Sequence, residues 1–458
     1  MSRFIAFVLL CVSPFLSLVY SRADDADSRP GYAIVATVET LNDSDWRGVV
    51  EALAERRQQE YEVVQLTWSD NLTKEMSALR PKYACFVLQP EEATQARLAE
   101  IWKITRNLDD DPYGDVLWGI ITGYDAATAR RMTQTQDVVV ERAVAATSIP
   151  LDYFKTGVAY DEGQKNRRKV KEEGAQAVVL NDAPDDTTKA IADALDNAQL
   201  FVTSGHASER NWSIGYSYKN GFFVAQDGKL IGKPSNGPAF EINAKGSKVH
   251  LASGNCLWGN IDKRDCMALA MMNHANVDAF VGYVVPTWFG YMGWGVQDYY
   301  IEQPGRFTVA EAFFANNQAL LYLLEHSNGL SAQTVQGLKY DRDVVVLYGD
   351  PAWNNALAVQ DSGWKQTLTC ENSENGKKIW TLTLEPMRGE KSFALLDSNG
   401  SERGGRPIVQ FFRELVKDPK VLQGEEFNPL VLENFILIPV NQKLPVDKPT
   451  VIKIESNS

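Results

Sequence analysis

The chain has 458 residues, of which 44% are hydrophobic and 23% charged, and its formal net charge at pH 7 is −13. This hydrophobic content excludes an intrinsically disordered chain and predicts a folded protein with a large core. At roughly 100 to 200 residues for each folding unit, the length suggests two to four domains, and we expect three. Because a negatively charged protein repels a phosphate backbone, nucleic acid is not an expected partner.

Residues 1–23 have the pattern of a signal peptide: one early arginine, an apolar run, and small residues at the two positions that signal peptidase reads. The mature chain is therefore expected to begin near Asp24 and to be exported, whether secreted, periplasmic or held at the cell surface. A membrane anchor is the alternative. However, Pro14 and Ser17 interrupt a run that is shorter than the ~20 apolar residues needed to cross a bilayer. No membrane span is expected in the mature chain.

Two series of alternating strand and helix patterns follow. Residues 24–150 alternate β-rich runs with helical stretches, as in YAIVATV followed by SDWRGVVEALAERR. Residues 151–360 repeat the alternation, with apolar runs such as QLFVTSG, KVHLASG, VDAFVGYVV and VVVLYGD. Such alternation predicts βαβ units and a parallel sheet, and the continuous apolar runs indicate strands that are buried on both faces. We therefore expect two α/β subdomains, with a boundary near residue 150.

The helical periodicity ends near Gln360. The runs KQTLTCE, KIWTLTLEP, PIVQFF, NFILIPV and TVIKIE alternate between apolar and polar residues, which predicts a small β-sandwich over residues 361–458. Earlier in the chain, GFFVAQDGKLIG predicts a hairpin with an Asp-Gly turn. The expected fold class is α/β in two subdomains, followed by an all-β domain.

Two segments of the second subdomain are built alike. Gln199–Ala207 reads QLFVTSGHA and Lys248–Leu257 reads KVHLASGNCL, so each is an apolar strand that ends in Ser-Gly before one reactive side chain, His206 or Cys256. The carboxyl ends of parallel strands face the crevice where ligands bind, so adjacent strands would bring the two side chains to one edge. Cysteine is largely un-ionised at neutral pH, and a nearby imidazole is the usual group that activates it.

Each of these residues also has a structural interpretation. Taken singly, a packed histidine or a buried thiol is the simpler explanation, and it suffices for His250, His274 and His326 and for Cys85 and Cys266. The matched positions of His206 and Cys256 instead favour a catalytic dyad. The sequence contains no GxSxG elbow, HExxH pair or complete GxxxxGK[ST] loop, so serine-hydrolase, zincin and P-loop chemistry lack their signatures.

The SGHA and SGNC blocks resemble the histidine and cysteine blocks of caspase-related cysteine peptidases, most of all the gingipain type. The resemblance extends to Asp111–Asp125 (DPYGDVLWGIITGYD), Val281–Trp288 (VGYVVPTW) and Leu347–Trp353 (LYGDPAW), and it covers roughly residues 31–360. It implies caspase/gingipain-like parallel sheets with flanking helices in residues 24–150 and 151–360, the latter being the catalytic subdomain. A β-sandwich after the catalytic part is also found in gingipain-like chains.

The resemblance implies a role for individual residues. His206 corresponds to the general base and Cys256 to the nucleophile, and the oxyanion would be held by the backbone N–H groups of Cys256 and Ala207, where the family usually has glycine. Trp288 corresponds to the region that closes over the substrate side chain, and a buried core tryptophan is its alternative explanation. The implied function is a secreted cysteine endopeptidase that acts on protein or peptide substrates.

Three questions stay open at this level. A catalytically inactive, gingipain-like binding or scaffold protein would have the same fold, and a ligase or transpeptidase would form the same acyl-enzyme. The chemistry requires no cofactor. The metal content is unknown: Asp109, Asp110, Asp111 and Asp115 could hold a structural calcium ion, as gingipain-like enzymes do, or could form a solvated acidic loop.

Overall fold

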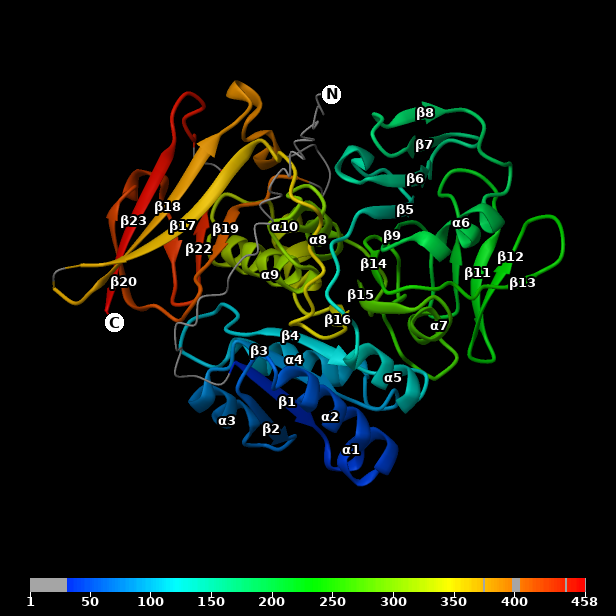
Figure 1. Ribbon diagram of the computed structural model, residues 1–458, viewed down its shortest axis with the longest axis horizontal. Coiled ribbons are helices and arrows are strands. Elements are labelled where there is room, and N and C mark those ends of the chain that lie inside the picture. Colours follow the sequence, from blue (N-terminus) through cyan, green and yellow to red (C-terminus); the bar gives the residue numbers. More distant parts are fainter. Residues whose placement is uncertain (1–30, 374, 398–403, 441–442, 458) are drawn as a thin grey trace, which may run out of the picture.

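The computed structural model describes residues 31–373, 375–397, 404–440 and 443–457. The predicted signal peptide and the expected mature start at Asp24 lie outside the described residues. The dominant element is a twelve-stranded sheet in the order β2-β1-β3-β4-β16-β15-β14-β9-β5-β6-β7-β8, which runs through the whole α/β part (Figure 1).

The first third of this sheet comes from the N-terminal part of the chain. Its four strands are parallel, as the sequence predicted, and every residue of the central strands is buried. The strands are β1 (Tyr32–Ala36), β2 (Val63–Thr67), β3 (Tyr83–Val87) and β4 (Leu117–Ile121), and the helices are α1 (Val38–Asn42), α2 (Ser44–Arg57), α3 (Leu72–Leu79), α4 (Gln95–Arg106) and α5 (Ala126–Thr133).

The remaining eight strands come from later in the chain. They are β5 (Arg142–Ala146), β6 (Thr156–Tyr160), β7 (Arg168–Lys171), β8 (Val178–Leu180), β9 (Leu200–Thr203), β14 (Lys248–Ala252), β15 (Val277–Tyr283) and β16 (Val345–Tyr348). Their helices are α6 (Thr188–Ala194), α7 (Met267–His274), α8 (Tyr291–Tyr300), α9 (Val309–Glu325) and α10 (Ala332–Asp341). The predicted hairpin is confirmed in a separate sheet of β10 (Asn211–Ser213), β11 (Phe222–Gln226), β12 (Lys229–Lys233) and β13 (Phe240–Glu241).

The prediction of parallel sheets needs a correction, because the twelve-stranded sheet is mixed. β16 is antiparallel to β15 but parallel to β4, and β7 is antiparallel to both of its neighbours. The chain returns to the sheet through α8, α9 and α10, so β16 enters from the opposite end to β15. The strands of the two expected subdomains are thereby joined in one sheet, through a single residue pair, Tyr348 with Ile120.

A buried polar cluster reinforces this narrow join. The Arg57 side chain of α2 forms a 2.7 Å ion pair with Asp350, and the Tyr32 hydroxyl of β1 donates a 2.8 Å hydrogen bond to the same carboxylate. All three side chains are almost completely buried. Asp350 follows β16, so these contacts tie the N-terminal strands to the end of the strand that links the two halves.

The C-terminal region consists of two antiparallel sheets. The four-stranded sheet contains β17 (Trp364–Asn372), β18 (Lys378–Pro386), β23 (Thr450–Asn457) and β20 (Lys417–Gln423), and the three-stranded sheet contains β19 (Ile408–Phe411), β22 (Phe435–Ile438) and β21 (Leu430–Val431). Alternate residues of both sheets share one core, including Leu382 and Ile452 from one and Ile408 and Ile436 from the other.

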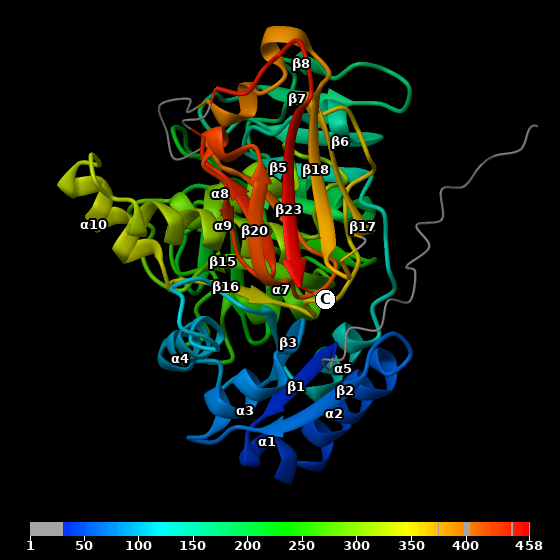
Figure 2. The same cartoon turned by 90° about the vertical axis from the view of Figure 1, so that its left-hand side faces the viewer.

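The three-stranded sheet also packs against the α/β part. Val409, Phe435 and Leu437 belong to the large core, and the Phe314 ring of α9 lies edge-on to Phe411 and Phe435 at 5.7 and 6.4 Å. Figure 2 shows the C-terminal strands in front of the α/β part and the N-terminal elements below it. None of the helices in the described ranges is long and apolar enough to cross a membrane.

Candidate functional site

The strands that carry His206 and Cys256 are neighbours in the sheet. β9 and β14 pair in parallel, and Thr203 at the end of β9 pairs with Ala252 at the end of β14. His206 follows three residues after Thr203, and Cys256 follows four residues after Ala252. The two residues therefore leave the same edge of the sheet on adjacent strands, whose backbones are separated by about 5 Å in a β-sheet.

Asn255 connects the two strand ends. Its side chain is fully buried. Its Oδ1 accepts a 2.8 Å hydrogen bond from the Thr203 hydroxyl, and its Nδ2 donates a 3.1 Å bond to the Gly205 carbonyl. Gly205 has φ of +93°, a conformation that costs little only for glycine. The residue directly before Cys256 thus fixes the turn directly before His206.

Further contacts join the two loops beyond the reactive residues. The Arg210 guanidinium forms a bidentate ion pair with Asp262, with distances of 2.8 and 2.6 Å. Asn260 Nδ2 donates to Glu209 Oε1 at 3.3 Å, and the Met267 N–H donates to the Glu209 carbonyl at 2.7 Å. The loop after His206 and the loop after Cys256 therefore form one connected surface rather than two independent segments.

The Cys256 thiol is half-buried and receives a backbone hydrogen bond. The Thr287 N–H, in the loop after β15, donates to Sγ at 3.2 Å. The next residue, Leu257, has φ of +59°, and its N–H donates to the Val285 carbonyl at 3.0 Å. A left-handed conformation at a leucine is strained, and the surrounding contacts must maintain it. Two contacts from the loop after β15 therefore hold the Cys256 sulfur and the residue that follows it.

The His206 ring is exposed. It stacks on the ring of Tyr216, with a centroid separation of 5.1 Å and an interplanar angle of 25°. The backbone carbonyl of His206 accepts a 2.9 Å hydrogen bond from the Ser213 N–H. Within the described residues no hydrogen bond joins this ring to Cys256 Sγ. Catalytic contacts of this kind are often long in free enzymes and shorten when substrate binds.

The two N–H groups expected to hold an oxyanion have no competing acceptor. Neither the Ala207 N–H nor the Cys256 N–H donates a hydrogen bond to another described residue. Ala207 is not among the residues with positive φ, so an alanine adopts this backbone without strain. Its side chain packs against the main core.

Trp288 is 49% exposed, so its interpretation as a buried core residue is wrong. Its ring lies edge-on to Tyr340 of α10, with centroids 5.6 Å apart, and the Tyr340 hydroxyl donates to the Pro286 carbonyl at 2.7 Å. Burial raises the pKa of Tyr340, with smaller contributions from the charges of Asp341 and Cys256. An exposed aromatic pair thus lies beside the loop whose Thr287 contacts the thiol.

His250, Cys85 and Cys266 fit the structural roles expected of them. His250 is buried among aromatic rings, its Nε2 lies 3.1 Å from the Thr203 hydroxyl, and burial lowers its pKa to about 3. Burial raises the pKa of Cys266 to about 12 and also raises that of Cys85. These thiols stay protonated and inaccessible, whereas Cys256 combines partial exposure with a hydrogen-bonded sulfur.

The predicted acidic cluster is present in part. Carboxylate oxygens of Asp109, Asp111 and Asp115 lie within 4.8 Å of one another, whereas Asp110 is exposed and lies outside the group. Burial is the main cause that raises the pKa of Asp115 to about 8. Three carboxylates suit Ca²⁺, but the Arg80 guanidinium lies 3.3 Å from Asp109 and 3.8 Å from Asp115 and already supplies a positive charge.

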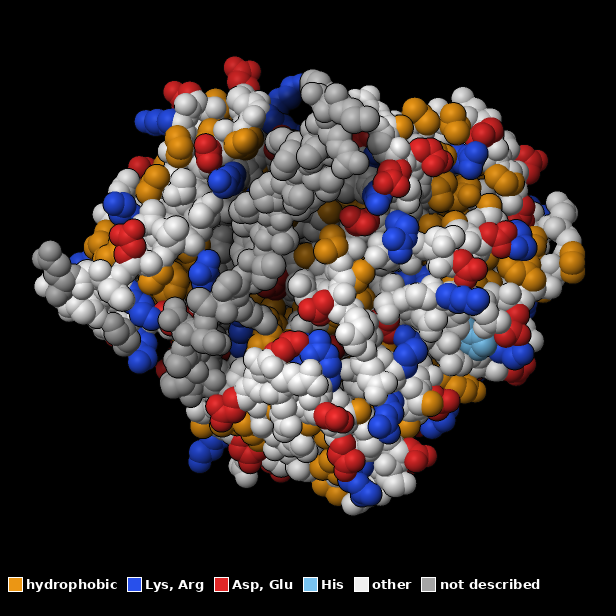
Figure 3. Space-filling view, viewed as in Figure 1, with side chains coloured by type: hydrophobic (Ala, Val, Ile, Leu, Met, Phe, Trp, Pro, Cys, Tyr) orange, Lys and Arg blue, Asp and Glu red, His pale blue; other side chains and the backbone are white. Residues whose placement is uncertain are grey.

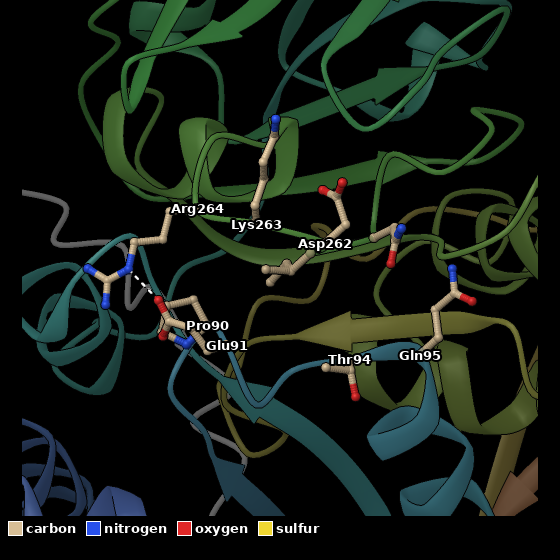
Figure 4. A pocket seen from close by; sticks show the side chains of 9 residues that line it. Pro90, Glu91, Thr94, Gln95, Asp262, Lys263 and Arg264 are labelled. Carbon is tan, nitrogen blue, oxygen red and sulfur yellow. Dashed lines mark hydrogen bonds and ion pairs between the residues drawn. The ribbon is translucent and has the colours of Figure 1, made fainter.

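A cavity of about 360 Å³ lies beside the loop that follows Cys256. Figure 4 shows its lining, which combines Asn260–Arg264 with the segment before α4, and the 2.5 Å hydrogen bond between Arg264 and Glu91 closes one side. Neither His206 nor Cys256 lines this cavity. It is therefore distinct from the edge of the sheet where the His206 and Cys256 turns leave β9 and β14.

Sequence reasoning missed the residues that position the site, namely Asn255, Thr287, Tyr216 and Tyr340. Asn255 had a detectable signal, because a polar residue between a strand-ending glycine and a reactive cysteine is well placed to bond the neighbouring turn. Thr287 acts through its backbone, which carries no signal in the residue type. Glu162 was also missed: its carboxylate accepts hydrogen bonds from Ser204 and Thr147, directly below the turn that carries His206.

On the face shown in Figure 3, Lys and Arg side chains are interspersed with Asp and Glu.

No known family model matches the chain, and neither a curated protein nor a solved structure matches it. The assignment of a function therefore depends on the chain's own residues and their geometry.

Proposed function

We propose that the protein is an exported cysteine endopeptidase of the gingipain-like, caspase-related kind, in which Cys256 is the nucleophile and His206 the general base. The observation that carries the proposal is the parallel pairing of β9 with β14, with Thr203 opposite Ala252. This register accounts for the matched SGHA and SGNC blocks, because equivalent turns on adjacent strands deliver one base and one nucleophile to the same edge.

The mechanism begins when His206 takes the proton of the Cys256 thiol. The thiolate attacks the carbonyl carbon of a peptide bond, and the resulting oxyanion accepts hydrogen bonds from the N–H groups of Ala207 and Cys256. The C–N bond then breaks as His206 donates its proton to the leaving amine, which gives a thioester. His206 next removes a proton from water, and the water oxygen attacks the thioester and releases the carboxylate and the thiol. No cofactor enters these steps.

The environment of Cys256 supports this role. A sulfur that accepts the Thr287 N–H at 3.2 Å is a stronger acceptor as a thiolate than as a thiol. The exposed rings of Trp288 and Tyr340 form an apolar surface next to it, which suits the side chain of a bound peptide. The preference for a particular substrate side chain is best determined with a positional-scanning library of fluorogenic peptides.

The test compares the mature chain with Cys256→Ala, His206→Ala and Cys370→Ala. Cys370 lies in β17 of the C-terminal sheet and is exposed, so its replacement controls for the loss of an accessible thiol. Cys256→Ala should abolish peptide cleavage, and His206→Ala should lower kcat/KM by about 10²- to 10⁴-fold. Rapid alkylation of Cys256 by iodoacetamide without cleavage of any peptide would instead indicate an inactive binding protein. Full cleavage by Cys256→Ala would overturn the proposal.

A further inference from the structure

A larger cavity, of about 590 Å³, lies between the α/β part and the C-terminal sheets. Most of its lining comes from three regions of the chain: the segment that leads into α9, the linker and start of β17, and the end of β19. In Figure 1 these elements lie side by side to the left of centre. The cavity shares no residue with the His206 and Cys256 loops, so its occupant would bind independently of the peptidase chemistry.

Aromatic side chains form part of the wall of this cavity. Phe307, Phe314, Phe411, Phe412 and Trp364 line it, and most of them are buried by contacts with one another and with the core. Two of the large apolar side chains that the protein leaves in solvent, Val359 at 78% and Met387 at 55% exposure, also line the cavity. A bound apolar group would therefore cover surface that the protein alone leaves in water.

Arg306 supplies a positive charge beside these aromatic rings. Its guanidinium lies over the Trp364 ring at 4.5 Å and donates to three neutral acceptors: Gln303 Oε1 at 2.5 Å, Ser362 Oγ at 3.2 Å and the Trp364 carbonyl at 3.0 Å. Across the described ranges, no carboxylate lies within ion-pair distance of it. Burial lowers the pKa of Arg306 to about 10, so the group remains charged at neutral pH.

The carboxylates that line the cavity are already engaged. Glu311 accepts the Thr308 N–H at 2.8 Å in the capping box of α9, and Asp361 pairs with Arg388 at 2.8 Å. Asp115 lies 3.8 Å from the Arg80 guanidinium. On the cationic side, Lys365 and Arg413 join Arg306 in the lining. The lining therefore has more cationic than acidic side chains, next to an aromatic wall.

We propose that this interdomain cavity binds an organic carboxylate with an apolar body, whose carboxylate pairs with Arg306 and whose body lies against the aromatic walls. A partly buried arginine matches a carboxylate in shape as well as in charge. The volume is in the range typical of small-molecule sites. Two sources share this chemistry, a fatty acid and the C-terminus of a peptide that ends in an apolar residue.

The experiment uses the full mature chain that carries Cys256→Ala, so that no peptide probe can be cleaved and the result does not depend on the proposed peptidase activity. Titration calorimetry compares the affinity for dodecanoate with that for dodecanol. It likewise compares acetyl-Leu-Phe that has a free carboxylate with the amide of the same peptide. We expect one acid to bind at least about tenfold more tightly than its neutral partner, because only the acid can pair with Arg306. The arm that binds identifies the source.

Two sets of variants complete the test. Arg306→Met keeps the length of the side chain without its charge and should weaken binding of the acid by about tenfold or more. Because Arg306 also bonds the linker before β17 and its loss can prevent folding, the exposed pair Lys365→Glu with Arg413→Glu provides a second route and should weaken binding severalfold. Absence of binding at about 1 mM, equal affinity for acid and neutral partner, or unchanged affinity in the doubly reversed variant would each overturn the proposal.

Discussion

Replacement of Asn255 by alanine should separate the positioning of the site from its chemistry. The side chain makes two hydrogen bonds, to the Thr203 hydroxyl at 2.8 Å and to the Gly205 carbonyl at 3.1 Å, and it is fully buried. Its loss leaves both the Thr203 hydroxyl and the Gly205 carbonyl without this partner. At about 1–3 kcal/mol for each buried group left unsatisfied, we expect the free energy of unfolding to fall by about 2–4 kcal/mol.

The effect on catalysis should be larger than the effect of instability alone. Asn255 is the direct link between the turn before His206 and the residue before Cys256, so its loss lets the two loops separate. A misplacement of about 1 Å can cost about 10²-fold in rate. We therefore expect kcat to fall by about that factor at a temperature where the variant is fully folded, with a smaller change in KM. Urea unfolding and steady-state kinetics on one fluorogenic peptide measure the two effects.

Asn273→Ala is the matched control. Asn273 lies in α7, and its Nδ2 donates a 3.2 Å hydrogen bond to the Gly228 carbonyl, so the variant loses a comparable bond outside the turns that carry His206 and Cys256. It should lose stability without losing kcat. The reasoning is refuted if Asn255→Ala, once folded, keeps the wild-type kcat, or if Asn273→Ala loses as much activity.

Three further results are expected. Gly205→Ala has space for the added carbon, but the residue has φ of +93°, so the variant should lose about 1–2 kcal/mol of stability and also activity. Gly237→Ala, at φ of +109° in an open loop, should lose stability alone. Denaturant melts and kinetics distinguish the two variants. Because the pKa of His250 is lowered to about 3 in the folded protein, the unfolded chain binds an extra proton below about pH 6.5. Stability should therefore fall as the pH is lowered from about 6.5 to about 3, and it should fall less in His250→Gln. The raised pKa of Asp115, about 8, has the opposite effect on stability. Its contribution to the free energy of unfolding is complete below about pH 4 and is lost as the pH rises to about 8. Asp115→Asn should therefore flatten the decline in stability that urea melts show over that range.

The sequence predicted the elements whose hydrophobic pattern is decisive. The strands that end at Thr203 and Ala252 are short, apolar and followed by glycine, and their burial follows directly from that pattern. The direction of β16 could not be predicted in the same way, because a four-residue apolar run has the same pattern in either direction. Its orientation depends on the three helices that precede it, and two of those, α8 and α10, were not predicted.

The omission of α8 has a physical reason. Its sequence, YMGWGVQDYY, contains two glycines, which lower helix propensity. Both are required by close approach: a Cβ on Gly293 would overlap the Ser253 carbonyl, and one on Gly295 would overlap the Asn316 side chain of α9. The residues that weaken the local helical signal are therefore the ones that allow α8 to pack against the turn that carries Cys256.

The restraints on the proposed dyad are unequal. α8 supports the turn before Cys256 from one side, since Trp294 lies 3.1 Å from the position of a Cβ on Gly254, and the Thr287 N–H contacts the sulfur from the loop after β15. His206 is held at its backbone, and its exposed ring stacks on the exposed ring of Tyr216. This difference in restraint suits the different roles of the nucleophile and the base. The position of the thiol determines where a scissile carbonyl must bind, and the imidazole is the group that can adjust when the leaving amine replaces the thiol as its partner.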